Sequence, residues 1–200
     1  MHKLCSTLLC LLFVGCFFGE DDSDSEVCFI GDSITYLWDL EFFFPTQTII
    51  KHAVSGAIVQ DFDKWDLSDC EGKRTVVLIG TNNVSNNHIE DSSSAGLRTY
   101  FVREYQKRVY ALHADPLIAV SILPRNEFYE QDSSVNMNIQ ALNREIQDSL
   151  HSMDIRYEYI DVFDKFIKTG YEIKRDFFKD GLHPNEAGYE ILAREIGKKL

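Results

Sequence analysis

The sequence Val-Cys-Phe-Ile-Gly-Asp-Ser, residues 27–33, decides the fold because it joins a continuous apolar run to a tight turn. A run of apolar residues without alternation is typical of a strand that is covered on both faces, as strands of parallel sheets are. Four similar runs follow and predict further strands at residues 48–53, 75–79, 117–122 and 155–160.

Longer amphipathic stretches separate these runs and predict helices at residues 34–43, 58–65, 94–113, 135–152 and 186–199. Pro184 stands just before the last of them, where proline suits a helix start. We expect residues 161–179 to hold a short helix and a long loop. Strands that alternate with helices predict an α/β fold, a three-layer αβα sandwich around a central parallel sheet of roughly five strands.

Length and charge narrow the class of protein. A chain of 200 residues fits one domain, and that size buries enough surface to fold without cross-links. Its 32 acidic and 20 basic side chains give a net charge of −12. Such a surface repels phosphate backbones, so we expect no nucleic-acid partner. A small neutral or cationic substrate is compatible with this charge.

The first residues do not belong to the predicted fold. An apolar run at residues 4–18 follows Lys3 and has the length of a signal-peptide core, short for a bilayer span. We expect residues 1–19 to be a signal peptide or lipoprotein leader, residues 20–26 an acidic leader, and residues 27–200 the folded domain. A buried N-terminal helix and an uncleaved membrane anchor are the alternatives. The predicted location is exported, either secreted or periplasmic.

The use of cysteine fits an exported protein only loosely. Residues 13–16, Phe-Val-Gly-Cys, resemble a bacterial lipoprotein box, which would place a lipid on Cys16 and attach the chain to a membrane; plain secretion is the alternative. Cys28 and Cys70 lie in the domain. Two such cysteines can pair in an oxidising compartment. Because Cys28 falls in a predicted core strand, however, we expect buried free thiols.

Polar residues follow the predicted strands, and the carboxyl ends of parallel strands form one edge of the sheet, where ligands bind. Ser33 follows the first strand at a helix start, which suits a nucleophile but also an N-cap serine. Asp180 precedes His183 by three residues. This spacing lets the carboxylate hold one ring nitrogen and leaves the other for a serine; a loop-ending turn is the alternative. We expect no such partner for His52, His88, His113 and His151.

Ester chemistry also needs donors for a developing oxyanion. The backbone N–H groups of Ser33 and Gly56 and the side-chain amide of Asn82 follow three different strands and can serve together. Taken singly, Gly56 is equally a turn residue and Asn82 a loop asparagine.

Four segments in this order resemble the successive blocks of the SGNH (GDSL-type) hydrolases: residues 31–35 (Gly-Asp-Ser-Ile-Thr), Gly56, residues 80–83 (Gly-Thr-Asn-Asn) and residues 180–184 (Asp-Gly-Leu-His-Pro). The resemblance covers nearly all of residues 27–200 and implies a flavodoxin-like SGNH fold. It implies three roles: nucleophile for Ser33, base for His183 with Asp180 behind it, and oxyanion hole for Ser33, Gly56 and Asn82.

Two positions depart from the family pattern. Ile34 stands where the family's name has leucine, and Asn83 stands where many members have aspartate. Asn83 and Arg125 follow the third and fourth strands and are candidate substrate-binding residues. Phe128 and Tyr129 lie in a predicted loop at the strand ends and are candidates for a pocket wall, with a place in the core as the alternative.

These residues predict a serine esterase that cleaves carboxylic esters through an acyl-enzyme. The expected substrate is a short-chain ester, such as an acetyl ester, of a carbohydrate or small molecule. The alternatives are a lysophospholipase- or thioesterase-like acylhydrolase, a non-catalytic SGNH-like binding module, and a flavodoxin-like binder of phosphate or flavin. The sequence has no dinucleotide, P-loop or zinc-spacing motif, so we expect no cofactor and no metal. It does not predict the oligomeric state.

Overall fold

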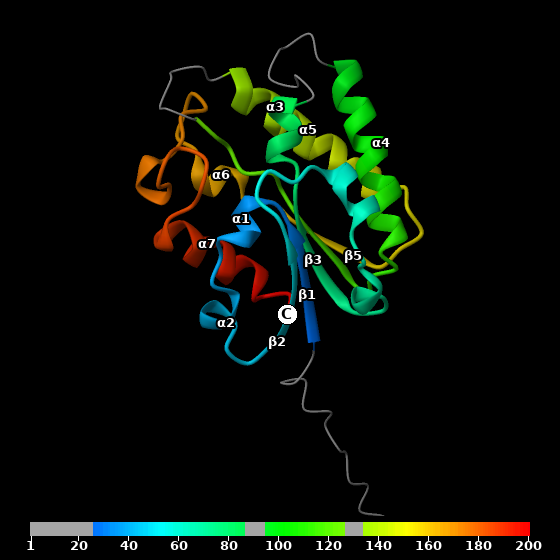
Figure 1. Ribbon diagram of the computed structural model, residues 1–200. Coiled ribbons are helices and arrows are strands. Elements are labelled where there is room, and N and C mark those ends of the chain that lie inside the picture. The colour runs from blue at the N-terminus through cyan, green and yellow to red at the C-terminus, as the bar shows by residue number, and fades with distance from the viewer. Residues whose placement is uncertain (1–25, 87–94, 127–133) are drawn as a thin grey trace, which may run out of the picture.

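The computed structural model describes residues 26–86, 95–126 and 134–200 (Figure 1). Its centre is a five-stranded sheet in the order β2-β1-β3-β4-β5, and every pair of neighbours is parallel. The strands are β1 (Glu26–Gly31), β2 (Thr48–Ala53), β3 (Arg74–Leu78), β4 (Leu117–Val120) and β5 (Tyr157–Ile160). The predicted α/β class and parallel sheet are confirmed.

Strand β1 lies between β2 and β3 in the sheet, and it is buried on both faces because its apolar residues alternate between two cores. Val27 and Phe29 pack into one core, and Cys28 and Ile30 pack into the other. All four side chains are at most 1% exposed. This double burial explains why the run carries no polar residue.

Helices cover the two faces of the sheet and complete the three layers (Figure 1). One core is shared with α4 (Ala95–Ala111) and α5 (Ser134–His151), and it also takes in α3 (Thr81–Asn86) and the 3₁₀ helices η2 (Val59–Lys64) and η3 (Ser68–Cys70). The opposite core is shared with α1 (Ser33–Tyr36), α2 (Leu40–Phe43) and α7 (Glu186–Ile196). Residues 161–179 hold the expected short helix, α6 (Phe163–Phe166), and within the expected loop a 3₁₀ helix, η5 (Arg175–Phe177).

Two predicted helices differ from the observed ones. The predicted helix 34–43 is divided into α1 and α2, because the Asp39 side chain accepts a hydrogen bond from Phe42 N and starts a new helix. The predicted helix 58–65 is the 3₁₀ helix η2. Its first N–H groups bond to side chains, Ile58 N to Asp61 and Val59 N to Asn83.

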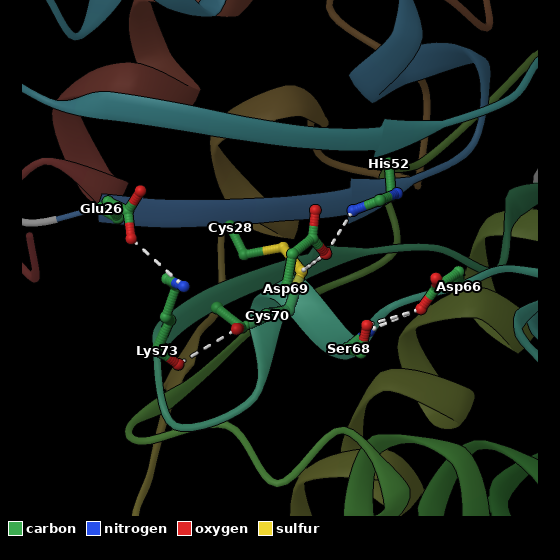
Figure 2. Close-up of a disulfide and its surroundings, with 9 residues drawn as sticks. Glu26, Cys28, His52, Asp66, Ser68, Asp69, Cys70 and Lys73 are labelled. Carbon is green, nitrogen blue, oxygen red and sulfur yellow. Dashed lines mark hydrogen bonds and ion pairs between the residues drawn. A yellow bond between two sulfur atoms is a disulfide. The ribbon is translucent and has the colours of Figure 1, made fainter.

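Cys28 and Cys70 form a disulfide (Figure 2), so the expectation of free thiols was wrong. The bond joins β1 to η3 across 42 positions, with the two Cα atoms 5.6 Å apart. Cys28 is buried as expected, but Cys70 is buried in the same core, so burial does not prevent the two cysteines from pairing.

The predicted leader and Cys16 lie outside the described residues. Within the described parts of the chain, no helix has both the length and the apolar character that a membrane crossing requires.

Candidate active site

The strand order sets the place of the site. From β1 the chain moves to β2 on one side and then to β3 on the other, which makes the carboxyl ends of β1 and β3 the switch point where such sheets bind ligands. Ser33 begins α1 directly after β1. The loop that carries Gly56 follows β2, and Asn82 lies in the first turn of α3 after β3. Ser33 is therefore flanked by both segments.

The turn after β1 has little freedom. A Cβ atom on Gly31 would clash with the Leu78 carbonyl oxygen and with the Thr35 side chain, so glycine is required there. Asp32 caps α1, and its Oδ1 accepts a hydrogen bond from Ile34 N at 3.0 Å. Ser33 is thereby fixed as the first residue of α1 and is 6% exposed.

The loop that carries His183 is held by its own backbone. Asp180 Oδ1 accepts hydrogen bonds from Leu182 N at 3.0 Å and from His183 N at 2.8 Å. Gly181 takes a φ of 84°, a left-handed conformation that favours glycine. Its carbonyl oxygen accepts from Asn126 N at 2.8 Å, which ties the loop to the end of the segment after β4.

Ser33, His183 and Asp180 form a continuous line of hydrogen bonds. His183 Nε2 lies 3.0 Å from Ser33 Oγ, and His183 Nδ1 lies 2.7 Å from Asp180 Oδ2. An ionised carboxylate only accepts hydrogen bonds, so Nδ1 carries the proton and Nε2 is the acceptor for the Ser33 hydroxyl. The structure thus brings together three residues that are up to 150 positions apart.

Asp180, which ends this line, and Asp32, which caps α1 beside Ser33, have pKa values shifted in opposite directions. Burial raises the pKa of Asp32 to about 6, although N–H groups of Ile34, Gly80 and Thr81 and the charge of His183 favour its ionised form. For Asp180, partial burial also acts to raise the pKa, but the hydrogen bonds from the His183 ring and from two backbone N–H groups outweigh it and lower the pKa. Asp180 is therefore ionised at neutral pH.

The predicted oxyanion donors Gly56 and Asn82 follow β2 and β3, the two strands that flank β1. Gly56 is exposed, with a φ of 80° and open space where a Cβ would stand. Asn82 Nδ2 donates to the Ala57 carbonyl oxygen at 2.9 Å. This bond orients the amide and leaves its second N–H for a ligand.

Two of the predicted substrate-binding residues, Asn83 and Arg125, bond to other parts of the protein. Asn83 is fully buried and uses both ends of its amide on η2, accepting from Val59 N and donating to Gln60, so its prediction as a substrate contact was wrong. Arg125 is 7% exposed and donates to the Thr81 carbonyl oxygen, where it supports the start of α3. Phe128 and Tyr129 lie outside the described residues.

Sequence reasoning missed two supports of the site. Asp32 binds the backbone of both the β1 and β3 turns. Asn136 and Asn143 on α5 accept from Arg125 N and Ile122 N and hold the segment after β4. The spacing of Asn136 and Asn143 could have indicated them, because residues seven positions apart lie on one face of a helix. In the structure both side chains are buried.

His52 was also misjudged. It has a carboxylate partner, since its Nε2 lies 2.8 Å from Asp69 Oδ1. The partner follows 17 positions later in a different element, so no local spacing indicated it.

Solved structures with the same fold include known hydrolases. A GDSL-like lipase from Bacteroides thetaiotaomicron has a TM-score of 0.68 and 23% identity over 88% of this chain and 87% of its own. A variant of an acetyl xylan esterase from Geobacillus stearothermophilus has a TM-score of 0.62 and 18% identity over 88% and 94%. A lipase/acylhydrolase from Enterococcus faecalis has a TM-score of 0.62 and 15% identity over the same shares.

No curated protein sequence matches the chain significantly. The model of the GDSL-like lipase/acylhydrolase family matches residues 29–191. That range includes the turn after β1 and the Asp180–His183 loop. The chain therefore belongs to the GDSL-like lipase/acylhydrolase family and is an ester hydrolase of the GDSL type.

Proposed function

We propose that the chain is a serine esterase in which Ser33 attacks the ester carbonyl, His183 accepts the serine proton and Asp180 stabilises the resulting imidazolium. The observation that carries this proposal is the line of hydrogen bonds from Ser33 Oγ through His183 to Asp180. It supplies a nucleophile, a base and an orienting carboxylate in one geometry.

The reaction follows in two halves. Ser33 Oγ forms a bond to the carbonyl carbon, and the ester C–O bond breaks as His183 returns the proton to the leaving alcohol. Water then attacks the acyl-enzyme with His183 again as base and releases the acid. In both halves the N–H groups of Ser33 and Gly56 and the amide of Asn82 stabilise the oxyanion.

We propose short acyl esters, such as acetyl esters of a carbohydrate or a small molecule, as substrates. The long segment after β5 is not available as an apolar lid, because Phe166, Ile173 and Phe178 turn into the core and are at most 4% exposed. Neighbours with this fold include acetyl xylan esterases, so the fold accommodates an acetyl ester of a glycan.

One observation favours longer acyl chains as a second candidate. Tyr36, Leu37 and Phe42 follow the nucleophile and are 55%, 47% and 67% exposed. Exposed apolar side chains of this size can form a wall for a longer acyl chain, since each buried methylene contributes about 0.8 kcal/mol.

Aryl esters from acetate to palmitate separate the two candidates. A maximum of kcat/KM at acetyl to about hexanoyl supports the first, and a maximum at decanoyl or beyond supports the second. Ser33→Ala should reduce turnover to background with an unchanged melting temperature, whereas the control Ser55→Ala, in the exposed loop after β2, should keep it. Full activity in Ser33→Ala would refute the assignment, and a folded wild type without turnover on any ester would favour a binding module.

We also propose that the protein is exported, on the ground of the apolar run at residues 4–18 and the acidic stretch at residues 20–26. A chain that begins at Asp24 should fold and hydrolyse esters like the full chain. Cell fractionation of the full chain tests the location, and a cytoplasmic product of full length would contradict it.

A further inference from the structure

A second group of reactive side chains lies around the disulfide, away from Ser33 and His183. Cys28, His52 and Cys70 each offer one ligand atom, and these three atoms all lie within 4.8 Å of one another. Asp69 joins them: its Oδ1 is 2.8 Å from His52 Nε2 and 3.6 Å from Cys70 Sγ. Figure 2 shows the His52 imidazole directed toward the Asp69 carboxylate, which lies beside the disulfide.

The four side chains come from three elements, two of which are neighbouring strands of the sheet. Cys28 lies on β1, His52 on the neighbouring strand β2, and Asp69 and Cys70 on η3. The β1–β2 register pairs Ile30 with His52, so Cys28 and His52 lie on adjacent strands and are offset by two residues. Donor atoms on paired strands need little rearrangement to bind an ion.

We propose that this cluster is a zinc site when the disulfide is reduced, with Cys28, Cys70, His52 and Asp69 as the four ligands of one Zn²⁺. Two sulfurs, one imidazole nitrogen and one carboxylate oxygen are donors that zinc accepts in four-coordinate sites. The site is separate from the proposed esterase chemistry.

Reduction of the disulfide requires two electrons, and a water-soluble phosphine supplies them. The phosphine is oxidised to its oxide with oxygen from water, and the S–S bond is reduced to two thiols. Zinc then displaces the two thiol protons, which go to solvent, because thiolates are the ligands. Two thiolates and one carboxylate around the ion leave a local charge of about −1.

Burial and access both suit an ion. The two cysteines are fully buried, which protects the zinc–sulfur bonds from solvent. The side chains of His52 and Asp69 are 24% and 52% exposed, so these two ligands form the entry side. A bound ion would link β1 to η3 as the disulfide does, since it would hold the same two cysteines.

The test uses the full chain with Co²⁺ as a spectroscopic probe. The protein is reduced with the phosphine without oxygen, freed of the reductant and titrated with Co²⁺. We expect one ion per chain, visible bands of a tetrahedral centre and thiolate-to-metal charge transfer, all lost when Zn²⁺ is added. The oxidised protein should bind none. Zn²⁺ should also raise the melting temperature of the reduced protein toward that of the oxidised one.

Variants distinguish this site from adventitious binding by thiols. His52→Ala should weaken Co²⁺ binding by more than about 100-fold, because even the loss of a group that only supports a ligand costs 10- to 100-fold. The control His151→Ala, at the end of α5, should bind like wild type. Circular dichroism reports whether each reduced protein stays folded.

Three results would overturn the proposal. The first is a folded reduced wild type without tetrahedral bands, and the second is wild-type affinity in His52→Ala. The third is a reduced wild type that unfolds and that Zn²⁺ does not restore, since the ion would then fail to replace the link between β1 and η3.

Discussion

Asp180→Asn tests how much of the proposed catalysis depends on a carboxylate that faces solvent. The change keeps the size of the side chain and removes the negative charge 2.7 Å from His183 Nδ1. That charge stabilises the imidazolium formed when Ser33 loses its proton. We therefore expect a lower kcat with a nearly unchanged KM, because the charged histidine exists only during reaction.

The solvent exposure of Asp180 and His183 sets the size of the expected loss in kcat. Two unit charges about 4 Å apart attract by about 1 kcal/mol in water and about 4 kcal/mol near a protein surface. The Asp180 side chain is 54% exposed and that of His183 is 22% exposed, which places the interaction toward the weaker end, at about 2 kcal/mol. That value corresponds to a loss of about 30-fold in kcat.

Steady-state kinetics on a short aryl ester measure the loss. His183→Ala should lower kcat further than Asp180→Asn, since it removes the base itself. Asp115→Asn is the charge-matched control, because Asp115 precedes β4 at the opposite edge of the sheet and pairs with Arg156. The pKa of Asp180 is lowered, so the wild-type carboxylate carries its charge throughout assays above about pH 4. A loss near 10⁴-fold, as for the buried aspartate of the serine protease triad, or no loss at all, would refute the reasoning.

Three further variants test the frame of the site. Asn82→Ala should lower kcat by about 10²–10³-fold in the same assay, because one oxyanion donor is lost. Gly31→Ala should lower the free energy of unfolding by about 1–3 kcal/mol in urea, because its Cβ meets the Leu78 carbonyl oxygen. Asp32→Asn should gain stability relative to wild type as pH rises from 4 to 7 in urea titrations. The folded wild type binds the Asp32 proton more tightly than the unfolded chain does, with a pKa raised to about 6, so ionisation costs the wild type about 3 kcal/mol across that window. An Asp32→Asn stability difference independent of pH would contradict this cause.

Strands β1, β3 and β4 could be predicted from the sequence because burial on both faces leaves an almost continuous apolar run. Residues 48–53 were predicted as β2 with its observed bounds. The ends of the helices were harder to predict from the sequence. Residues 34–43 carry a helical pattern, but a hydrogen bond from Phe42 N to Asp39 starts a second helix inside it, and the pattern alone does not show which aspartate caps.

The site was predictable where its residues stand in short motifs at strand ends. Ser33 and the Asp180–His183 pair follow from that placement and from the family resemblance. The role of Asn83 was not predictable, because its partners Val59 and Gln60 lie more than 20 positions away. The same is true of the disulfide, since 42 positions separate Cys28 from Cys70. Such pairs become neighbours only through the strand order.

The two aspartates beside the site show how environment divides one residue type into two functions. Asp32 is 1% exposed and holds backbone N–H groups from two turns, so its carboxylate fixes where Ser33 stands relative to the start of α3. Asp180 is half exposed and holds the His183 ring, so in the proposed reaction its carboxylate stabilises the imidazolium. If the two environments were exchanged, the carboxyl behind the histidine would have a raised pKa and would lose its charge in mild acid. An uncharged carboxyl would not stabilise the imidazolium. The exposed position of Asp180 therefore keeps the proposed base oriented over a wide range of pH, at the cost of a weaker interaction with its charge.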